Sequence, residues 1–302
     1  MTPRSCPFLL VLLLVACLPW PLSGCDRPGP TVSEADPQEL RIASLSPALT
    51  QALIDFDCAR HLVGCTPYAP PGVEDVPVVG DLLSPNLERL LVVSPTLLLV
   101  QPSSSGIDPD LASLAESRGW RIATWRIDRL SDIRRIVDEL PELLIDLGVS
   151  AHPIESAVGA WRQRSLELLT PVPAFSALGR VVVLYGVDPP SAFGTDTYVD
   201  DVLVSLGIEN AVRRSGYPEL SLEDLLVLAP DTVVVVGRDL ESARASADQL
   251  AGRLDALADR TRFLGADGSK LLIPGTGVLD GVDSLRKHLL RALAHSNEGG
   301  SS

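Results

Sequence analysis

The sequence has few of the residues on which several functions depend. Lysine occurs only as Lys270 and Lys287, and 39 acidic residues outnumber 25 lysines and arginines, giving a formal net charge of −14. A nucleic-acid groove needs a stripe of basic side chains to displace counterions, and an anionic membrane needs a basic patch, so this balance argues against both partners. Aromatic residues make up only 4% of the chain, a small supply for any stacking surface.

Motifs for catalysis and metal binding are missing as well. The sequence has no G-x-S-x-G, H-E-x-x-H, P-loop or C-x-x-C motif, and its four histidines are scattered. Asp196, Asp200 and Asp201 stand just before a helical run, and we interpret them as a helix cap and first-turn acids rather than metal ligands. We therefore expect no enzyme activity, no metal site and no resident cofactor.

What the chain does contain begins with an export signal. Residues 1–24 carry Arg4, an apolar run too short to span a membrane, and two prolines that end it. The Leu22-Ser23-Gly24-Cys25 sequence that follows resembles the lipobox of bacterial lipoproteins. This resemblance implies that Cys25 is lipidated and anchors the protein to the outer side of the cytoplasmic membrane, in the periplasm of a Gram-negative cell. An ordinary signal with a chance cysteine is the alternative.

Residues 25–38 are polar and rich in proline, as expected of a tether between the anchor and a folded domain. Two further cysteines, Cys58 and Cys65, follow this tether. In an oxidising compartment they can pair as a disulfide, and otherwise they are small buried hydrophobic residues. The sequence leaves both interpretations open.

With 302 residues, 46% of them hydrophobic, the chain is long enough for two globular domains. Short β-rich runs alternate with helical stretches, a pattern typical of parallel α/β sheets. Residues 131–169 lack strand signals and repeat leucine and isoleucine at helical spacing. We expect an N-terminal α/β lobe, a bridging helix, a C-terminal α/β lobe whose last strand is Lys270–Ile273, and a tail, at residues 39–148, 149–172, 173–296 and 297–302.

An internal repeat supports two similar lobes. Residues 87–100 align without gaps to residues 222–235, and seven of the 14 positions are identical. Each copy predicts an amphipathic helix, a proline that ends it and a buried strand.

Several segments then identify a family. RIASLSPALTQAL, LVGCTPYAPP and VPVVGDLLSPNLERLLVVSPTLLLV in the first half, with VVVLYGVDPPSAFGTDTYVDDVLVSLGIENAV and YPELSLEDLLVLAPDTVVVV in the second, resemble cluster III solute-binding proteins of ABC importers. These are the vitamin B12 and ferric-siderophore receptors. The resemblance implies two three-layer α/β lobes joined by a single long helix, with a ligand cleft between them. It also implies a monomer that delivers its ligand to an ABC permease dimer with its ATPase.

Glu88 and Glu223 occupy equivalent positions in the repeat. In the family, one glutamate near the tip of each lobe is similar in placement and pairs with an arginine of the permease dimer, so the resemblance implies docking roles for both. Alternatively, each is a solvated carboxylate in the first turn of a helix, where the helix dipole favours negative charge.

The resemblance places the ligand at loops that carry Tyr68, Leu82, Gln101, Tyr185, Phe193 and Tyr217. Vitamin B12 receptors have several tryptophans in these loops, and ferric-siderophore receptors tend to have arginines; at these loop positions this chain has neither a tryptophan nor an arginine. The ligand class stays open between a corrinoid and a metal chelate. A lipoprotein scaffold or sensor that keeps the fold without transport is the alternative function.

Overall fold

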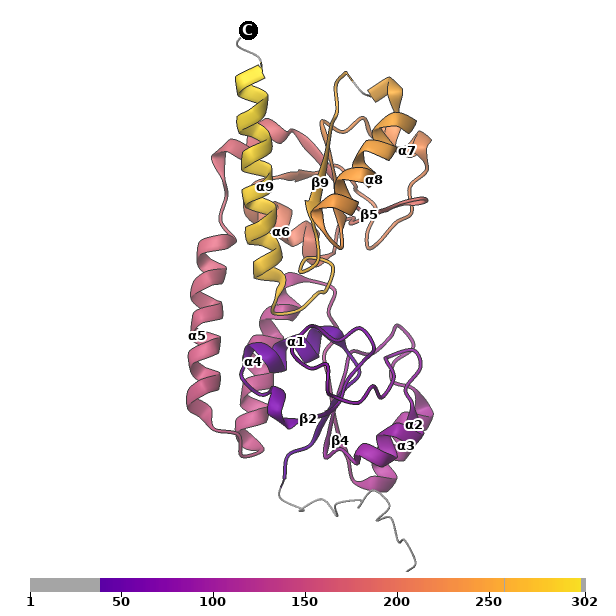
Figure 1. Cartoon of the computed structure of the whole chain (residues 1–302), viewed down its shortest axis with the longest axis vertical. Coiled ribbons are helices and arrows are strands. Elements are labelled where there is room, and N and C mark those ends of the chain that lie inside the picture. Colours follow the sequence, from indigo (N-terminus) through magenta and orange to yellow (C-terminus); the bar gives the residue numbers. More distant parts are fainter. Residues whose placement is uncertain (1–38, 258, 300–302) are drawn as a thin grey trace, which may run out of the picture. The chain divides into compact units, whose positions relative to one another are not determined.

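The computed structural model describes residues 39–257 and 259–299, with side chains described up to residue 294 (Figure 1). The expected signal sequence, Cys25, the tether and the end of the tail lie outside the described residues. Among the described residues, no helix has the length and apolar character needed to cross a membrane.

The N-terminal lobe is built on a parallel sheet of four strands in the order β2-β1-β3-β4. The strands are β1 (Ile42–Ser44), β2 (Leu62–Gly64), β3 (Leu97–Val100) and β4 (Arg121–Thr124). The helices of this lobe are α1 (Pro47–Asp55), the short 3₁₀ helix η1 (Ala59–His61), α2 (Leu87–Val93) and α3 (Pro109–Arg118).

Both faces of this sheet are covered. The side chains of Ala43 and Leu98 pack in one cluster with α2 and α3. Those of Ile42 and Leu99 belong to a second cluster with α1 and the helix α4 (Leu130–Asp146). Because it is covered on both faces, the central strand β3 consists of continuous apolar residues, all of them buried. These three layers confirm the expected architecture of the first lobe.

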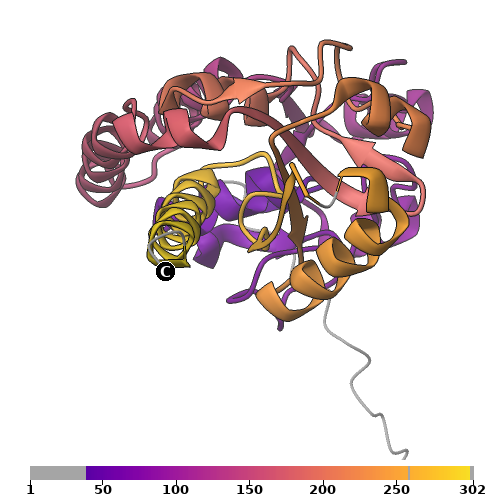
Figure 2. The ribbon, with the colours of Figure 1, turned by 90° about the horizontal axis from the view of Figure 1, so that it is seen from above.

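The C-terminal lobe has a second, mostly parallel sheet in the order β6-β5-β8-β9, with the short β7 also paired to β5. Its strands are β5 (Arg180–Val187), the antiparallel β6 (Pro190–Ala192), β7 (Glu209–Asn210), β8 (Thr232–Gly237) and β9 (Arg262–Asp267). Its helices are η2 (Pro173–Leu178), α6 (Tyr198–Leu206), α7 (Leu222–Leu228), α8 (Leu240–Arg253), η3 (Asp255–Leu257) and α9 (Val278–Gly299). Figure 2 shows α8 (orange) and α9 (yellow) on opposite sides of the strands.

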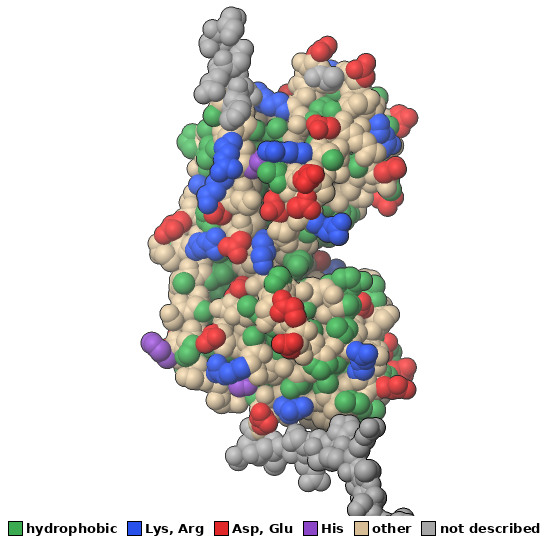
Figure 3. Space-filling model, in the orientation of Figure 1, with side chains coloured by type: hydrophobic (Ala, Val, Ile, Leu, Met, Phe, Trp, Pro, Cys, Tyr) green, Lys and Arg blue, Asp and Glu red, His purple; other side chains and the backbone are tan. Residues whose placement is uncertain are grey.

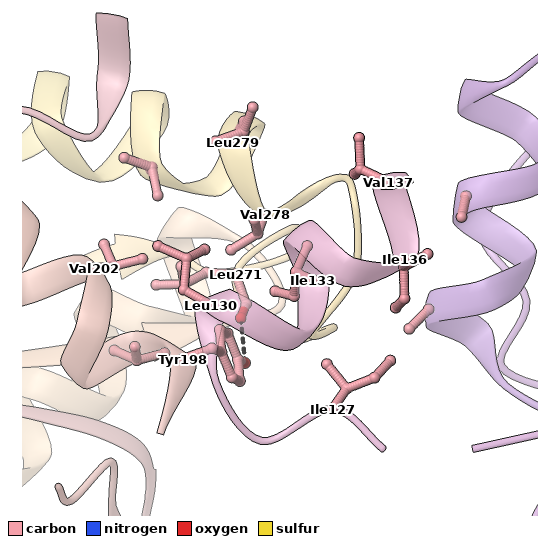
Figure 4. Close-up of a cluster of buried hydrophobic side chains, with 14 of the residues drawn as sticks. Ile127, Leu130, Ile133, Ile136, Val137, Tyr198, Val202, Leu271, Val278 and Leu279 are labelled. Atoms are coloured by element: carbon pink, nitrogen blue, oxygen red, sulfur yellow. Dashed lines mark hydrogen bonds between the residues drawn. The ribbon is translucent and has the colours of Figure 1, made fainter. Parts of the chain in front are cut away.

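Two helices link the lobes, α4 (Leu130–Asp146) and α5 (Ala151–Leu168). Helix α4 contacts α6 of the C-terminal lobe, and α5 contacts both α4 and α9. One hydrophobic core runs through the junction: Leu130 and Ile133 of α4 lie beside Tyr198 and Val202 of α6, and Leu271 and Val278 close the cluster (Figure 4). The junction is therefore packed protein interior and involves more than the single long helix that the resemblance implies.

The prediction of a strand at Lys270–Ile273 is wrong. These residues form turns, and the last strand is β9, whose sequence RFLGAD has a weaker β pattern. Its Gly265 is needed for packing, because an added Cβ would lie 2.3 Å from the backbone nitrogen of Arg244 in α8. The apolar run that resembled a strand contributes to the hydrophobic core from a turn, because Leu271 is fully buried.

Cys58 and Cys65 do not form the disulfide that the sequence left open. Both are free and buried, and the thiols donate to the carbonyl oxygens of Phe56 (3.3 Å) and Val76 (3.6 Å). Burial raises the pKa of the Cys58 thiol to about 11. Both residues act as small hydrophobic core residues.

The internal repeat is also a structural repeat. Helices α2 and α7 are both seven residues long, and each leads into a central strand of its own sheet. Leu97 of β3 pairs with Ile42 of β1, and the equivalent Thr232 of β8 pairs with Val181 of β5. The two lobes thus contain the same helix–strand unit in the same place.

Candidate ligand-binding site

An aromatic cavity lies in the C-terminal lobe. Its volume is about 280 Å³, and its lining residues are Tyr185, Phe193, Tyr198, Tyr217, Leu272 and Pro274. Tyr185 lies near the carboxyl end of β5, and Phe193 follows β6 and is held by its N–H, which donates to the Val183 carbonyl (3.0 Å). Ligands of parallel α/β sheets bind at the carboxyl ends of the strands, so this is the expected position for a site.

Four rings form one cluster. The centroid distances from Phe193 are 5.0 Å to Tyr185, 5.8 Å to Tyr217 and 5.9 Å to Tyr198, and the ring planes are tilted or edge-on. These are favourable aromatic geometries, and the mutual contacts hold the rings in fixed orientations. The cavity wall is therefore preorganised.

The four rings divide into a buried base and an exposed rim. Phe193 and Tyr198 are only 3% and 2% exposed, whereas Tyr185 and Tyr217 are 38% and 45% exposed. The Tyr198 hydroxyl donates to the Leu271 carbonyl at 2.6 Å, which satisfies its polar end (Figure 4). Tyr185 and Tyr217 keep part of their surfaces open to solvent.

Tyr217 keeps its proton at neutral pH. Burial raises the pKa of Tyr217 to about 12, and the negative charge of Asp128 and the neighbouring Tyr185 add to the shift. Its hydroxyl is therefore a neutral hydrogen-bond donor and acceptor.

The sequence predicted three of these six lining residues, and the structure brings Tyr185, Phe193 and Tyr217 together. It missed Tyr198, Leu272 and Pro274. Tyr198 is the first residue of a helix and not part of a loop, and Leu272 falls in the run that resembles a strand. The sequence signal that could have identified Tyr198 is its position five residues after Phe193, directly after the residue that caps α6.

The three predicted residues of the N-terminal lobe are separate from this cavity. Tyr68 is 68% exposed in the loop after β2, and Leu82 is half-buried against the lobe core. The Oε1 atom of Gln101, just after β3, accepts a hydrogen bond from the Ser46 hydroxyl (3.0 Å). A cavity of about 390 Å³ is lined by residues between Cys65 and Val78. Tyr68 belongs to this loop, but it is not among the lining residues.

A larger cavity, of about 460 Å³, lies between α8, β9 and α9, with Arg244, Phe263 and His288 among its lining residues. It is bordered by the middle of β9 rather than by loops at the carboxyl ends of the strands. The aromatic cavity therefore fits a ligand site of this fold better.

An ion-pair cluster joins the lobes next to the aromatic cavity. The Arg129 guanidinium donates to Asp201 (Nε to Oδ2, 2.9 Å) and to Asp196 (Nη1 to Oδ1, 2.7 Å), and the Leu130 N–H also donates to Asp201 (2.9 Å). Partial burial alone would raise the pKa of the Asp201 carboxyl, but the hydrogen bonds from Arg129 and Leu130 outweigh it and lower the pKa.

The three aspartates before and within α6 therefore differ from one another. The N-cap of α6 is Thr197, whose hydroxyl accepts from the Asp200 N–H (3.2 Å), so the expected capping role of Asp196 is wrong. Asp200 and Asp201 are in the first turn as expected. Among the residues that the structure describes, no group of three or more His, Cys, Asp or Glu side chains is placed to hold a metal.

Glu88 and Glu223 are exposed in the first turns of α2 and α7. The side chains of Asn86 and Ser221 cap these helices by accepting from the N–H groups of Arg89 (2.9 Å) and Asp224 (3.0 Å). The two carboxylates thus have equivalent local settings in the two lobes.

Two three-layer lobes, a helical junction and a cavity at the strand ends match the architecture of two-lobed solute-binding proteins, and the similarity to named relatives supports the cluster III type for this chain. The relatives found by comparison are named as binding proteins and not as enzymes, in agreement with the absence of catalytic motifs.

The sequence is 26% identical over 210 residues to the vitamin B12-binding protein of Salmonella paratyphi A, spanning 66% of this chain and 73% of that protein. The periplasmic vitamin B12-binding protein of Vibrio cholerae has the same fold, with a TM-score of 0.65 and 21% identity over 83% of this chain and 97% of that one. A periplasmic haem-binding protein from Pseudomonas aeruginosa aligns with a TM-score of 0.62 and 25% identity, covering 80% and 89% of the two chains. No family model matches the sequence.

Proposed function

We propose that this protein is the lipid-anchored receptor of an ABC importer and that it captures a large, flat corrinoid-like or iron-chelate ligand between its lobes. The observation that carries this proposal is the aromatic cavity of the C-terminal lobe, with the partly exposed rings of Tyr185 and Tyr217 at its rim. Exposed aromatic faces over a buried apolar base suit a planar ligand with an apolar face.

The chemistry of the lining favours a macrocycle over a strongly anionic chelate. The residues that line the cavity are aromatic or aliphatic, and no arginine or lysine is among them. A highly charged chelate needs cationic partners to offset its desolvation, whereas a corrinoid or haem face is satisfied by ring contacts and a few hydroxyls. Similar proteins are named as binding vitamin B12 and haem, which agrees with a macrocyclic ligand.

The cavity of about 280 Å³ is smaller than the pocket that a macrocycle fills. Ligand sites of drug-sized molecules occupy about 300–1,000 Å³. We therefore assign the remaining contacts to the N-terminal lobe, through the exposed Tyr68 together with Leu82 and Gln101.

Delivery and location complete the proposal. Glu88 and Glu223 dock the two lobes on an ABC permease dimer, and Cys25 carries the lipid anchor. The bridging segment of residues 149–172, which contains α5, links the lobes together with α4. The structurally similar proteins are named as periplasmic, which supports the same compartment for this chain.

The test is a titration of the purified full chain with cyanocobalamin and with haem, followed by absorbance and by thermal melting. We expect one of the two to raise the melting temperature by several degrees, because ligand binding to the folded state stabilises it. Tyr217→Ala and Tyr185→Ala should each weaken binding about tenfold, which corresponds to the loss of about 1.4 kcal/mol of ring contact.

Tyr217→Phe separates the two roles of that residue, because it keeps the ring and removes the hydroxyl. Leu166→Ala, at an exposed position of α5, is the matched control and should bind as the unchanged protein does. No response to either ligand would contradict a transport receptor of this class and favour the scaffold or sensor.

A further inference from the structure

The outer helices α2 and α7 end in the same unusual way. Each is closed by a residue in the left-handed region that is not glycine: Ser94 has φ 42° and ψ 66°, and Ala229 has φ 41° and ψ 61°. This conformation costs a residue with a Cβ about 1–2 kcal/mol. The same strained ending in both lobes fixes both helices at the same length.

A pair of arginines holds these helix ends in place. Arg41 Nη2 donates to the Val93 carbonyl (2.7 Å), and Arg180 Nη1 donates to the carbonyl of the equivalent Leu228 (2.9 Å). The backbone N–H groups of the two arginines donate to the equivalent side chains of Thr96 and Asp231, at 3.0 and 2.8 Å. Each helix is therefore tied to the first strand of its own sheet by the same contacts.

The helices present the same pair of side chains to solvent. Val92 is 78% exposed and the equivalent Val227 is 85% exposed. Each valine lies four residues after the docking glutamate of its helix, and residues four apart share one face of a helix. Figure 3 shows acidic side chains over α7 and beside α2 and α3.

Single exposed apolar side chains are common on protein surfaces and do not by themselves indicate a binding site. Leu166 and Val204, 70% and 66% exposed, are examples on α5 and α6. Val92 and Val227 differ from these because the same exposure recurs at equivalent positions beside equivalent carboxylates. A partner that contacts both must itself offer two equivalent sites.

We infer that Glu88 with Val92, and Glu223 with Val227, are two equivalent docking patches, each an acid beside an apolar contact, for the two subunits of the permease dimer. Each permease subunit then presents a cationic side chain next to a small apolar hollow that receives the valine. The acidic component disfavours an anionic lipid surface as the occupant. This inference rests on the proposed function and adds the apolar half of the contact.

The first experiment places a photo-cross-linking amino acid in the full chain at Val92 or Val227, in cells of the source organism. Leu166 and Val204 are the matched control positions. We expect one ABC permease polypeptide, identified by mass spectrometry, to be captured from both valine positions and from neither control. Capture from a single valine position, or equally from the controls, overturns the two-patch inference.

The second experiment measures binding of the purified full chain to that permease in lipid nanodiscs. Val92→Ser and Val227→Ser should each weaken binding about tenfold, since burying a valine side chain is worth about 1.5 kcal/mol or more. Charge reversal by Glu88→Lys with Glu223→Lys should abolish binding.

These variants separate the two ideas. If charge reversal abolishes binding and the serine variants leave it unchanged, the apolar contact is wrong and the transport function stands. If the unchanged protein binds no permease, the proposed function itself fails.

Discussion

The two lobes are alike at their outer helices and different at their ligand faces. Arg41 and Arg180 hold equivalent helices by equivalent bonds. Among the residues that the structure describes, the four-ring cluster of the C-terminal lobe has no counterpart around the exposed Tyr68 of the N-terminal lobe. A contact with a symmetric partner requires both copies to stay the same. A ligand without that symmetry makes no such demand on the two lobes, so the similarity of the outer helices and the difference in aromatic residues agree with the two roles that we propose for them.

The largest effect that we expect comes from the base of the aromatic cluster. Tyr198→Ala removes a ring that is 2% exposed and its hydrogen bond to Leu271, and should lower the free energy of unfolding by about 3–5 kcal/mol. Tyr68→Ala, at the exposed tyrosine of the other lobe, should change it by less than about 0.5 kcal/mol. Urea unfolding of the two variants measures the difference, and similar losses would remove the distinction between the ligand faces.

The next effect tests the junction between the lobes. Asp201→Asn should cost about 1–2 kcal/mol at pH 7, because it removes the charge that accepts from Arg129 and Leu130. The folded pKa of Asp201 lies below its unfolded value, so its contribution is present above about pH 4 and is lost as the pH falls through the folded pKa.

Denaturant midpoints between pH 7 and pH 2 check this dependence. The advantage of the unchanged protein over Asp201→Asn should vanish in acid. Asp138→Asn is the control, because its 2.6 Å pair with Arg162 is more than half exposed on both sides and should contribute little at any pH. An advantage that persists at pH 2 would assign the effect to packing rather than charge.

A matched pair of arginine variants sharpens the similarity of the outer helices. Arg41→Ala and Arg180→Ala should each cost about 1–2 kcal/mol, because each leaves a helix-end carbonyl without its donor. Hydrogen exchange should accelerate in α2 for the first variant and in α7 for the second. If the two variants lose stability by amounts that differ several-fold, the equivalent hydrogen bonds do not contribute equally to stability.

The smallest effect concerns the left-handed helix ends. Ala229→Gly relieves a Cβ at φ 41° and should stabilise the protein by up to about 1 kcal/mol. Ser94→Gly should give less, because it also removes the 2.7 Å bond from the Ser94 hydroxyl to the Leu91 carbonyl. Thermal melting ranks the two variants, and destabilisation at both positions would show that the left-handed ends are not strained.

Local sequence signals predicted the regular elements well and the site only in part. Asn86 and Ser221 before leucine-rich runs, and Pro95 and Pro230 after them, locate α2 and α7, because caps and prolines act on neighbouring backbone. β9 was missed because Gly265 is required by a distant helix, which no local pattern reveals. Leu271 belongs to the junction core for the same reason: only the folded chain brings α4, α6 and that turn together.

The aromatic cluster shows the same limit. Tyr185, Phe193 and Tyr217 were predictable as loop aromatics, but their ring contacts, and the part played by Tyr198 beneath them, depend on how three elements pack. The pairing of Cys58 and Cys65 was open for a related reason, since two nearby cysteines in sequence can point to different carbonyls in the core.

The core that continues from α4 into α6 has a consequence for the timing of capture and release. A wide separation of the lobes would expose the buried side chains of Leu130, Ile133, Tyr198 and Leu271 to water. We therefore expect no large opening motion in the free protein. For the proposed receptor, ligand association would then be limited by encounter with a surface that is already formed. Ligand release would require the proposed permease to supply the free energy that exposes this packed core to water.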